Sequence, residues 1–214
     1  MELFSFGPWL AKCRCAFLGE LGRSRHALIL GDGDGRFTAQ LLRSNRTVEV
    51  DAVDLSPAML RALVRRAGLH ASRVRSHHAD IRNWRPGKPS EIDHFLPQNR
   101  QKNAVFDLVI THFFLDCLTT SEAQTLAESL HPHLAPDAIW LISEFAIPHG
   151  IFGRLVARPL ISALYLAFGW LTGLAVRRLP DHHTALNAAG FRLSQTQTHL
   201  HGLLVSELWR PNID

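Results

Sequence analysis

The sequence predicts an α/β fold in which a mostly parallel sheet carries helices on both faces. Three observations predict it: short apolar runs alternate with helical patterns, a glycine-rich turn follows the first run, and the last two strand patterns form a hairpin. The 214 residues are 46% hydrophobic and 20% charged, which fits one globular domain. This composition excludes disordered, collagen-like and disulfide-scaffold proteins.

The first third of the chain contains two strand-turn-helix units. Residues 27–30 form an apolar run that enters the glycine-rich turn, and residues 37–42 begin a helix. A second strand at 48–53 precedes a helix at 57–66, for which Ser56 is a good N-cap. Pro57 fits the first helical position because its missing N–H has no helical partner to lose.

The middle of the chain continues the alternation. Its expected elements are a strand at 73–79, a long polar loop at 85–103, a strand at 106–111, a helix at 121–131 capped by Ser121, and a strand at 138–143. Alternating strands and helices predict parallel strands with helices on both faces of the sheet.

The C-terminal part predicts a helix and a hairpin. The helix covers residues 181–189 with Gly190 as its C-cap, and strands at 191–199 and 203–209 are joined by a short link. The hairpin closes the sheet.

Residues 159–176 form an uncharged, apolar run of eighteen residues bracketed by arginines, at the lower limit of membrane-spanning length. A single crossing would separate the last two strands from the five that they should join. We therefore expect residues 151–179 to be a lid-like or buried helical insertion, or a segment that contacts a membrane surface. With residues 1–24 as an N-terminal helical arm, the whole of 1–214 is expected to form one domain.

The charge of the chain is an arginine charge. The formal net charge is +4, and 20 of the 23 cationic side chains are arginines, which suit phosphate, carboxylate or anionic lipid but also reflect genome base composition. Three cysteines are an odd number, and no secretory leader pattern is present, so we expect a cytoplasmic location. Cys13 and Cys15 lack a second matching pair, and no residue pattern predicts a metal site.

The turn after the first strand reads GDGDG at residues 31–35, and such glycines let the backbone approach a ligand closely. A dinucleotide fingerprint would need a small residue at position 36, where Arg36 stands. A calcium loop would need oxygen ligands at positions 36 and 43, and both are arginines. The turn therefore favours a different ligand.

Two aspartates follow the next two strands. Asp54 is placed to accept hydrogen bonds from both ribose hydroxyls of an adenosine, or alternatively to cap the helix that begins at Pro57. Asp80 is placed to accept from an adenine amine, or alternatively to stabilise a turn. With the glycine turn, they predict a pocket for an adenosine-containing ligand.

At this point the chain resembles the class I S-adenosylmethionine-dependent methyltransferases. Four motifs carry the resemblance: LILGDGDGRF from Leu28, VDAVDLSPAML from Val50, HHAD from His77 and FDLVIT from Phe106. The resemblance covers residues 25–210 and implies a Rossmann-like, seven-stranded sheet whose last strand is antiparallel. S-adenosylmethionine is the implied cofactor. Its expected binding residues are Gly31, Asp32, Gly33, Gly35, Asp54, Leu55, Asp80, Ile81 and Thr111.

Two features refine this resemblance. The family often carries an acidic residue two positions before the first glycine, where this chain has Ile29, so Asp32 is the expected substitute. SEFAIP at 143–148, AGF at 189–191 and HGLLV at 201–205 are similar to the ubiquinone and menaquinone C-methyltransferases. That similarity implies a small lipophilic acceptor, resembling a quinone precursor, delivered from a membrane.

Methyl transfer needs chiefly positioning, and a base helps where the acceptor must lose a proton. The candidate catalytic residues stand at strand ends or after the apolar run: His112, Asp116, Glu144 and His182, with His183 beside the last. Nucleic acid is a less favoured acceptor because the chain lacks the proline-rich motif of base methyltransferases after its fourth strand. RNA or protein methylation, and a non-catalytic membrane-associated scaffold, are the alternatives.

Overall fold

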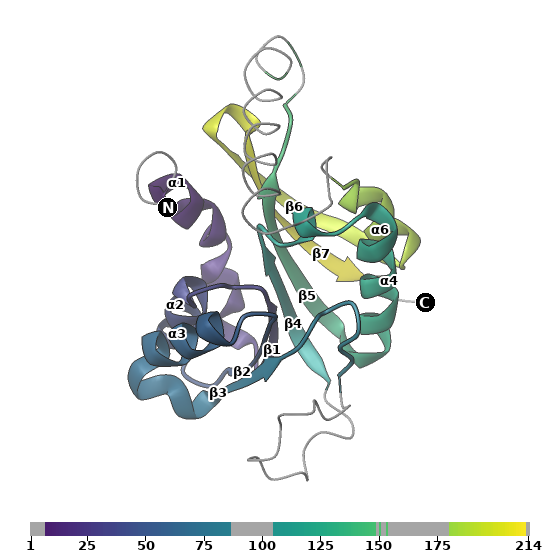
Figure 1. Cartoon of the computed structure of the whole chain (residues 1–214). Coiled ribbons are helices and arrows are strands. Elements are labelled where there is room, and N and C mark those ends of the chain that lie inside the picture. Colours follow the sequence, from purple (N-terminus) through teal and green to yellow (C-terminus); the bar gives the residue numbers. More distant parts are fainter. Residues whose placement is uncertain (1–6, 87–104, 149, 151–152, 154–179, 213–214) are drawn as a thin grey trace.

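The computed structural model describes residues 7–86, 105–148, 150, 153 and 180–212. Seven strands form one sheet in the order β3-β2-β1-β4-β5-β7-β6 (Figure 1). The strands are β1 (His26–Leu30), β2 (Glu49–Asp54), β3 (Val74–His78), β4 (Phe106–His112), β5 (Leu134–Phe145), β6 (Phe191–His199) and β7 (Leu204–Pro211). The predicted seven-stranded sheet is confirmed.

Strand direction also follows the prediction. β1 pairs in parallel with β2 and β4, β2 with β3, and β4 with β5. β7 lies between β5 and β6 and is antiparallel to both. The predicted terminal hairpin therefore closes the sheet with its last strand antiparallel. The link between β6 and β7 includes Leu200 and His201, both in the left-handed region at φ 49° and 55°.

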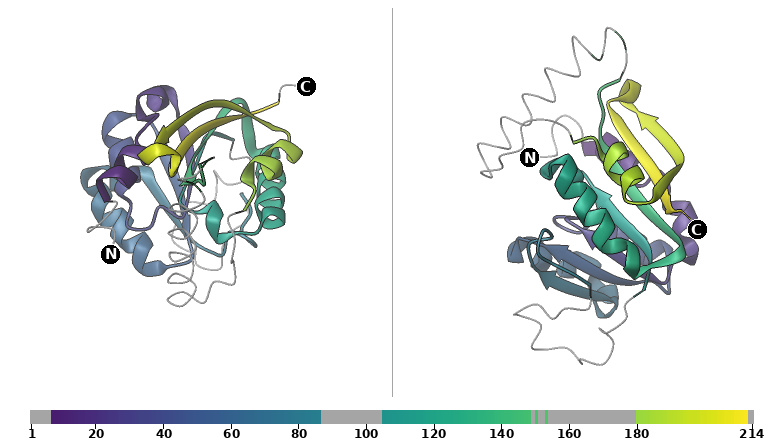
Figure 2. Two further views of the ribbon diagram at one scale, coloured as in Figure 1. Left: turned by 90° about the horizontal axis from the view of Figure 1, so that it is seen from above. Right: turned by 90° about the vertical axis from the view of Figure 1, so that its right-hand side faces the viewer.

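Helices cover both faces of the sheet, as the alternation predicts (Figures 1 and 2). The described helices are α1 (Gly7–Arg14), α2 (Arg36–Ser44), α3 (Pro57–Ala67), α4 (Thr120–Leu130) and α6 (His182–Ala188). A 3-10 helix, η1 (Leu18–Arg23), connects α1 to β1. α2 and α3 lie on one face, and α4 and α6 on the other.

Two apolar clusters hold these layers together, because successive strand residues point to opposite faces. In β1, Leu28 and Leu30 pack with the core under α4 and α6, whereas Ala27 and Ile29 pack with the core under α2 and α3. All four are buried. Ile29, which stands where the methyltransferase family often has an acid, is therefore a core residue.

Helix caps show one correct and one wrong prediction. Ser56 caps α3, and its hydroxyl accepts from Met59 N at 3.4 Å, with Pro57 in the first turn. The prediction that Ser121 caps the next helix is wrong, because Thr119 is the N-cap of α4. Thr119 and Glu122 form a reciprocal capping box that satisfies two backbone N–H groups at once. Ser121 lies inside the helix.

Two predicted segments fall largely outside the described residues, namely the loop at 85–103 and the insertion at 151–179 with its uncharged run at 159–176. In the part of the chain that the structure describes, no helix has the length and apolar character needed to cross a membrane.

Candidate active site

The candidate site lies at the carboxyl ends of the parallel strands. β1 pairs in parallel with β2 on one side and with β4 on the other, so the order in which successive strands are added to the sheet reverses between β1 and β4. In open α/β sheets, ligands bind in the crevice outside such a reversal point. The loops after β1, β2, β4 and β5 all reach this edge of the sheet (Figure 1).

The glycine turn after β1 requires glycine at three positions. Gly31, Gly33 and Gly35 have φ values of 69°, 58° and 78°, a region that side chains rarely adopt. A Cβ at Gly35 would lie 2.6 Å from the Cα of Leu63 in α3, so glycine also permits close packing of two helices. A Cβ at Gly33 would meet no atom within 4 Å. The middle of the turn therefore faces open space.

Asp32 and Asp54 flank this turn and have different roles. One oxygen of Asp32 accepts from the backbone N and the hydroxyl of Thr38 at 2.9 and 2.6 Å, which fixes the start of α2. Burial raises the pKa of Asp32, opposed by these hydrogen bonds and by the charge of Arg14. Asp54 ends β2 and accepts from Ser56 N at 2.7 Å. Burial raises the pKa of Asp54 as well, opposed by backbone hydrogen bonds from Ser56 and Gly33. Asp54 thus lies directly beside the glycine turn.

The other expected cofactor residues differ in exposure. Leu55 exposes 65% of its surface beside Asp54, an unusual position for a leucine. Asp80 accepts from Arg82 N at 3.0 Å and from its guanidinium at 3.3 Å, while Ile81 is buried in the core. Thr111 is fully buried, and its hydroxyl accepts from Trp140 Nε1 at 3.0 Å. The Thr111 side chain therefore supports β4 and β5 rather than facing open space.

His112 is the last residue of β4 and is 4% exposed. Its ring packs edge-on against Phe37 of α2, with centroids 4.5 Å apart. Neither ring nitrogen has a hydrogen-bond partner among the described residues. Burial and then the charge of Arg14 hold the pKa of His112 well below 6.5, so the ring is neutral. Burying an imidazole whose two nitrogens have no hydrogen-bond partner in the described chain costs free energy, and such groups are typical of functional sites.

The chain turns sharply after His112. Phe113 adopts a left-handed φ of 52°, which is rare for a bulky residue, and its N–H donates to Ser143 O at 2.6 Å. The Arg14 guanidinium of α1 lies over the Phe113 ring at 5.3 Å. The ring of Phe114 packs against Gly31, where a Cβ would clash with it. The end of β4 therefore touches both the glycine turn and α1.

Asp116 follows β4, and Glu144 is the second-to-last residue of β5; the charge of Asp116 acts on Glu144. Asp116 belongs to the 3-10 helix η4 (Leu115–Cys117), whose first N–H groups donate to Glu144. Glu144 Oε1 accepts from Phe114 N at 3.0 Å and from Leu115 N at 2.8 Å, whereas its buried Oε2 has no hydrogen-bond partner in the described chain. Burial, reinforced by the charge of Asp116, raises the pKa of Glu144 well above 4.5. Burial also raises the pKa of Asp116.

His182 and His183 open α6 and share one carboxylate. His182 Nε2 lies 3.0 Å and His183 Nε2 2.8 Å from the two oxygens of Glu207 in β7. Burial would raise the pKa of Glu207, but the hydrogen bonds from both histidines lower it to about 2. The sequence predicts His182 as a catalytic candidate, and the structure pairs its ring with Glu207.

Sequence reasoning missed two residues of this region. Arg14 lies in the N-terminal helical arm, outside the motifs of the sequence. Only its charge could have indicated a role in the site. Glu207 is the single acid of a mostly apolar strand and lies between Ser206 and Leu208, so no spacing rule connects it to histidines 24 and 25 residues earlier. An acid in a mostly apolar strand was the available signal.

The strand order, the antiparallel β7 and the glycine turn at the reversal point together define the class of Rossmann-like methyltransferases that use S-adenosylmethionine. The sequence model of the methyltransferase domain family matches residues 28–140, which is just over half of the chain. The chain belongs to this family. A search of curated proteins found no match.

Solved structures share the fold at low sequence identity. The chain is similar to the mitomycin 7-O-methyltransferase MmcR, with TM-score 0.70, 12% identity, and coverage of 94% of this chain and 53% of that one. It is similar to the N-methyltransferase NodS from Bradyrhizobium japonicum WM9, with TM-score 0.63, 13% identity and 100% coverage of both chains.

A third similar structure is the 1,6-didemethyltoxoflavin-N1-methyltransferase from Burkholderia thailandensis, solved with 1,6-didemethyltoxoflavin and S-adenosylhomocysteine. Its TM-score is 0.63 at 21% identity, covering 95% of this chain and 78% of that one. The chain spans between 53% and 57% of the first three structures found. These similarities establish the fold.

Proposed function

We propose that this chain transfers the methyl group of S-adenosylmethionine to an oxygen or nitrogen of a small, hydrophobic acceptor. The observation that carries the proposal is the arrangement at the carboxyl edge of the sheet. There, the positive-φ glycine turn and Asp54 lie on one side of the reversal point, and buried polar atoms of His112 and Glu144, which have no hydrogen-bond partner among the described residues, lie on the other. Family membership supports methyl transfer as the reaction, and the residues at this edge support the carboxyl edge as its proposed location.

The donor half of the site fits S-adenosylmethionine. The open space at Gly33 leaves room for a ligand against the turn, and Asp54 has lone pairs left for two ribose hydroxyls. The exposed Leu55 side chain offers an apolar surface for an adenine ring. Because Asp32 is engaged by Thr38, Arg14 is the better candidate for the charged end of the methionine portion. S-adenosylmethionine supplies a methyl group already activated by its sulfonium.

The acceptor half requires a group that takes a proton. Asp116 is partly exposed, has a raised pKa and lies beside Glu144, so it is the proposed base for a hydroxyl or amine. Glu144 holds the loop after β4 through its two backbone hydrogen bonds and positions Asp116. His112 is neutral and can accept a hydrogen bond from the acceptor or, as an alternative, act as the base.

Two features support a small acceptor. MmcR is a mitomycin 7-O-methyltransferase, and the toxoflavin enzyme methylates N1 of 1,6-didemethyltoxoflavin, so both act on small molecules. The hydrophobic character rests on the apolar run at 159–176, which we propose as the cover of the acceptor. A quinone-precursor-like acceptor and contact of residues 151–179 with a membrane surface belong to this same hypothesis.

A second candidate function is methylation of RNA or of a protein. The observation that favours it is a cavity of about 260 Å³ between α1 and α2, whose lining includes Arg14, Arg36, Arg43 and Arg66. Clustered arginines suit a polyanionic acceptor. Binding of RNA that weakens steeply with salt, together with methyl transfer to it, would favour this function over the first.

Donor binding is tested by calorimetry and thermal shift with S-adenosylmethionine, S-adenosylhomocysteine and NAD. We expect stabilisation by the first two only, and Asp54→Ala should weaken both. Asp34→Ala, in the same turn but bound to Arg36 and Arg66, is the matched control and should retain binding. Absence of any shift with the two sulfur ligands would refute the function.

Acceptor and membrane contact are tested separately. A panel of phenols, quinols and heterocyclic amines is ordered by increasing hydrophobicity. The rate of methyl transfer to these acceptors should rise along the series. Liposome flotation compares the wild type with a chain carrying charged substitutions between Leu164 and Leu174; equal flotation of both would argue against a lipid-facing segment.

A further inference from the structure

We propose that His182, His183 and Glu207 form a binding site for a divalent transition-metal ion of the zinc type. The three side chains come from the start of α6 and the middle of β7. Each offers one ligand atom, and these atoms lie within 4.8 Å of one another. The inference does not depend on the identity of the methyl acceptor.

The distances fit coordination around one ion. Zinc binds histidine nitrogen and carboxylate oxygen at about 2.0 to 2.2 Å in tetrahedral geometry, which places ligand atoms about 3.3 Å apart. The two histidine nitrogens lie 3.0 and 2.8 Å from the oxygens of Glu207. These two pairs, which use different oxygens of Glu207, would open by only a few tenths of an ångström around an ion, whereas the widest separation, up to 4.8 Å, would have to close by about 1.5 Å.

The surrounding groups hold the ligands in place. Trp209 Nε1 donates to Glu207 Oε2 at 2.9 Å, which orients the carboxylate as outer partners do in metal sites. The His183 ring packs edge-on against Trp209 with centroids 5.1 Å apart, and the rings of His182 and His183 lie 4.7 Å apart. Both imidazoles are thus directed toward one carboxylate before any ion arrives.

The exposed side chain of His183 leaves the site accessible to an ion from solvent. The side chains of Glu207 and His182 are 3% and 12% exposed, whereas that of His183 is 47% exposed. Three protein ligands with one open side are typical of zinc sites that keep a position for water or a substrate atom.

A second observation points to a missing partner on the same face of the sheet. Ile142 pairs with Glu207 and Glu144 with Val205, so Glu144 and Glu207 lie on one face of neighbouring strands. The Oε2 atom of Glu144 is buried and has no hydrogen-bond partner among the described residues. A metal ion, or water bound to it, would supply positive charge or donors to this buried acidic region.

The test uses Co²⁺ as a spectroscopic probe of the full chain without a histidine tag, followed by competition with Zn²⁺. We expect one Co²⁺ per chain with visible absorption bands of low-symmetry coordination, which Zn²⁺ displaces. His183→Ala removes a largely exposed ring and should fold normally, and Glu207→Gln keeps the shape of the carboxylate. Each should weaken Co²⁺ binding by more than the roughly 10- to 100-fold that loss of an outer partner costs.

His26→Ala is the matched control, because His26 also lies beside a carboxylate, with 4.0 Å between its Nε2 and Glu49 Oε2. It should leave Co²⁺ binding unchanged. Binding of equal strength in His183→Ala, or no saturable binding by the wild type, would overturn the proposal. If Glu207→Gln fails to fold by circular dichroism, His183→Ala alone decides the outcome.

Discussion

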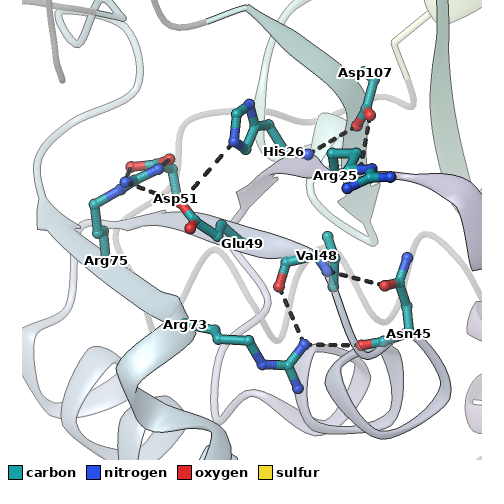
Figure 3. A network of polar contacts seen from close by, with 9 residues as sticks. All are labelled: Arg25, His26, Asn45, Val48, Glu49, Asp51, Arg73, Arg75 and Asp107. Carbon is teal, nitrogen blue, oxygen red and sulfur yellow. Dashed lines mark hydrogen bonds and ion pairs between the residues drawn. The ribbon is translucent and has the colours of Figure 1, made fainter.

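The polar groups at the two ends of the parallel strands differ in whether they have hydrogen-bond partners. At the amino-terminal half of β1, β2, β3 and β4, a polar network joins strands and loops through hydrogen bonds and ion pairs (Figure 3). Asp107 accepts from Arg25 N and His26 N at 2.7 and 3.0 Å, and Arg73 donates to the backbone oxygens of Leu42, Asn45 and Val48. At the carboxyl edge, His112 and Glu144 keep buried atoms without partners in the described chain.

We propose that this difference separates residues that stabilise the sheet from residues that serve the reaction. Asp51 binds Arg75 and His77, at distances of 2.6 to 2.9 Å, and each of these contacts fixes one strand on its neighbour. Buried polar groups without partners cost free energy, so we propose that those of His112 and Glu144, which have none in the described chain, serve the reaction. Substitutions of these polar groups should therefore lower activity at the carboxyl edge, whereas those of the polar network in Figure 3 should lower stability.

The largest expected effect concerns the proposed base at the carboxyl edge. Asp116→Asn should lower kcat for methyl transfer by about 10²- to 10⁴-fold, the usual contribution of a general base. Stability should not fall, because the change removes a charge that raises the pKa of Glu144. Initial rates and thermal melting measure the two quantities. Asp137→Asn, an exposed acid at the other end of β5, is the control; equal rates in both variants would exclude Asp116 as the base.

The glycine turn is expected to resist substitution where the backbone approaches α3. Gly35→Ala places a Cβ 2.6 Å from Leu63 Cα at φ 78°, and should lower the free energy of unfolding by about 2 to 5 kcal/mol. Gly33→Ala meets open space and should cost about 1 kcal/mol through its backbone conformation alone. Urea unfolding measures both, and equal losses would contradict the packing argument.

The amino half should lose stability without losing activity. Asp51→Asn should cost about 1 to 3 kcal/mol, since it breaks a mostly buried ion pair. Burial would raise the pKa of Asp51, but hydrogen bonds from His77 and Arg75 lower it below 3.8. Its stabilising contribution is thus complete above about pH 4 and is lost as the pH falls further.

Urea unfolding of the wild type and of Asp51→Asn from pH 7 down to pH 2 checks this sign. The difference in unfolding free energy between the two chains should shrink on acidification. A difference that is constant over this range would contradict the assignment of the ion pair.

The smallest expected effect is a stability gain at the carboxyl edge. The pKa of Glu144 is higher in the folded chain than in the unfolded chain, where it is near 4.5. The folded chain therefore keeps this proton to a higher pH. The free energy of unfolding therefore falls as the pH rises above 4.5. Glu144→Gln should remove this slope and stabilise the chain at pH 7. Glu128→Gln, an exposed acid on α4, should leave the slope unchanged in the same measurement.

The sequence predicts the sheet well because its signals are local. The apolar runs, the glycine turn and Ser56-Pro57 each report on a few neighbouring residues, and the structure confirms the elements that they indicate. Thr119 was missed because two capping residues stood close together, and the reciprocal bonds with Glu122 decide between them.

The site was predicted less completely because its chemistry depends on contacts between distant residues. The sequence identifies His112 and Glu144 as candidates, but not their unpartnered atoms, which depend on what packs around them. The engagement of Asp32 by Thr38 and the pairing of His182 with Glu207 likewise follow from tertiary structure.

The contact between α1 and β7 has a consequence for how the chain is made. Cys13 Sγ lies 3.4 Å from Ser206 Oγ, and the Ser206 hydroxyl donates to Cys13 O, across 193 residues of sequence. On the ribosome, α1 therefore emerges long before the strand against which it packs. Arg14 can take its place over the Phe113 ring only after β7 has joined the sheet, so we expect α1 to dock late in folding.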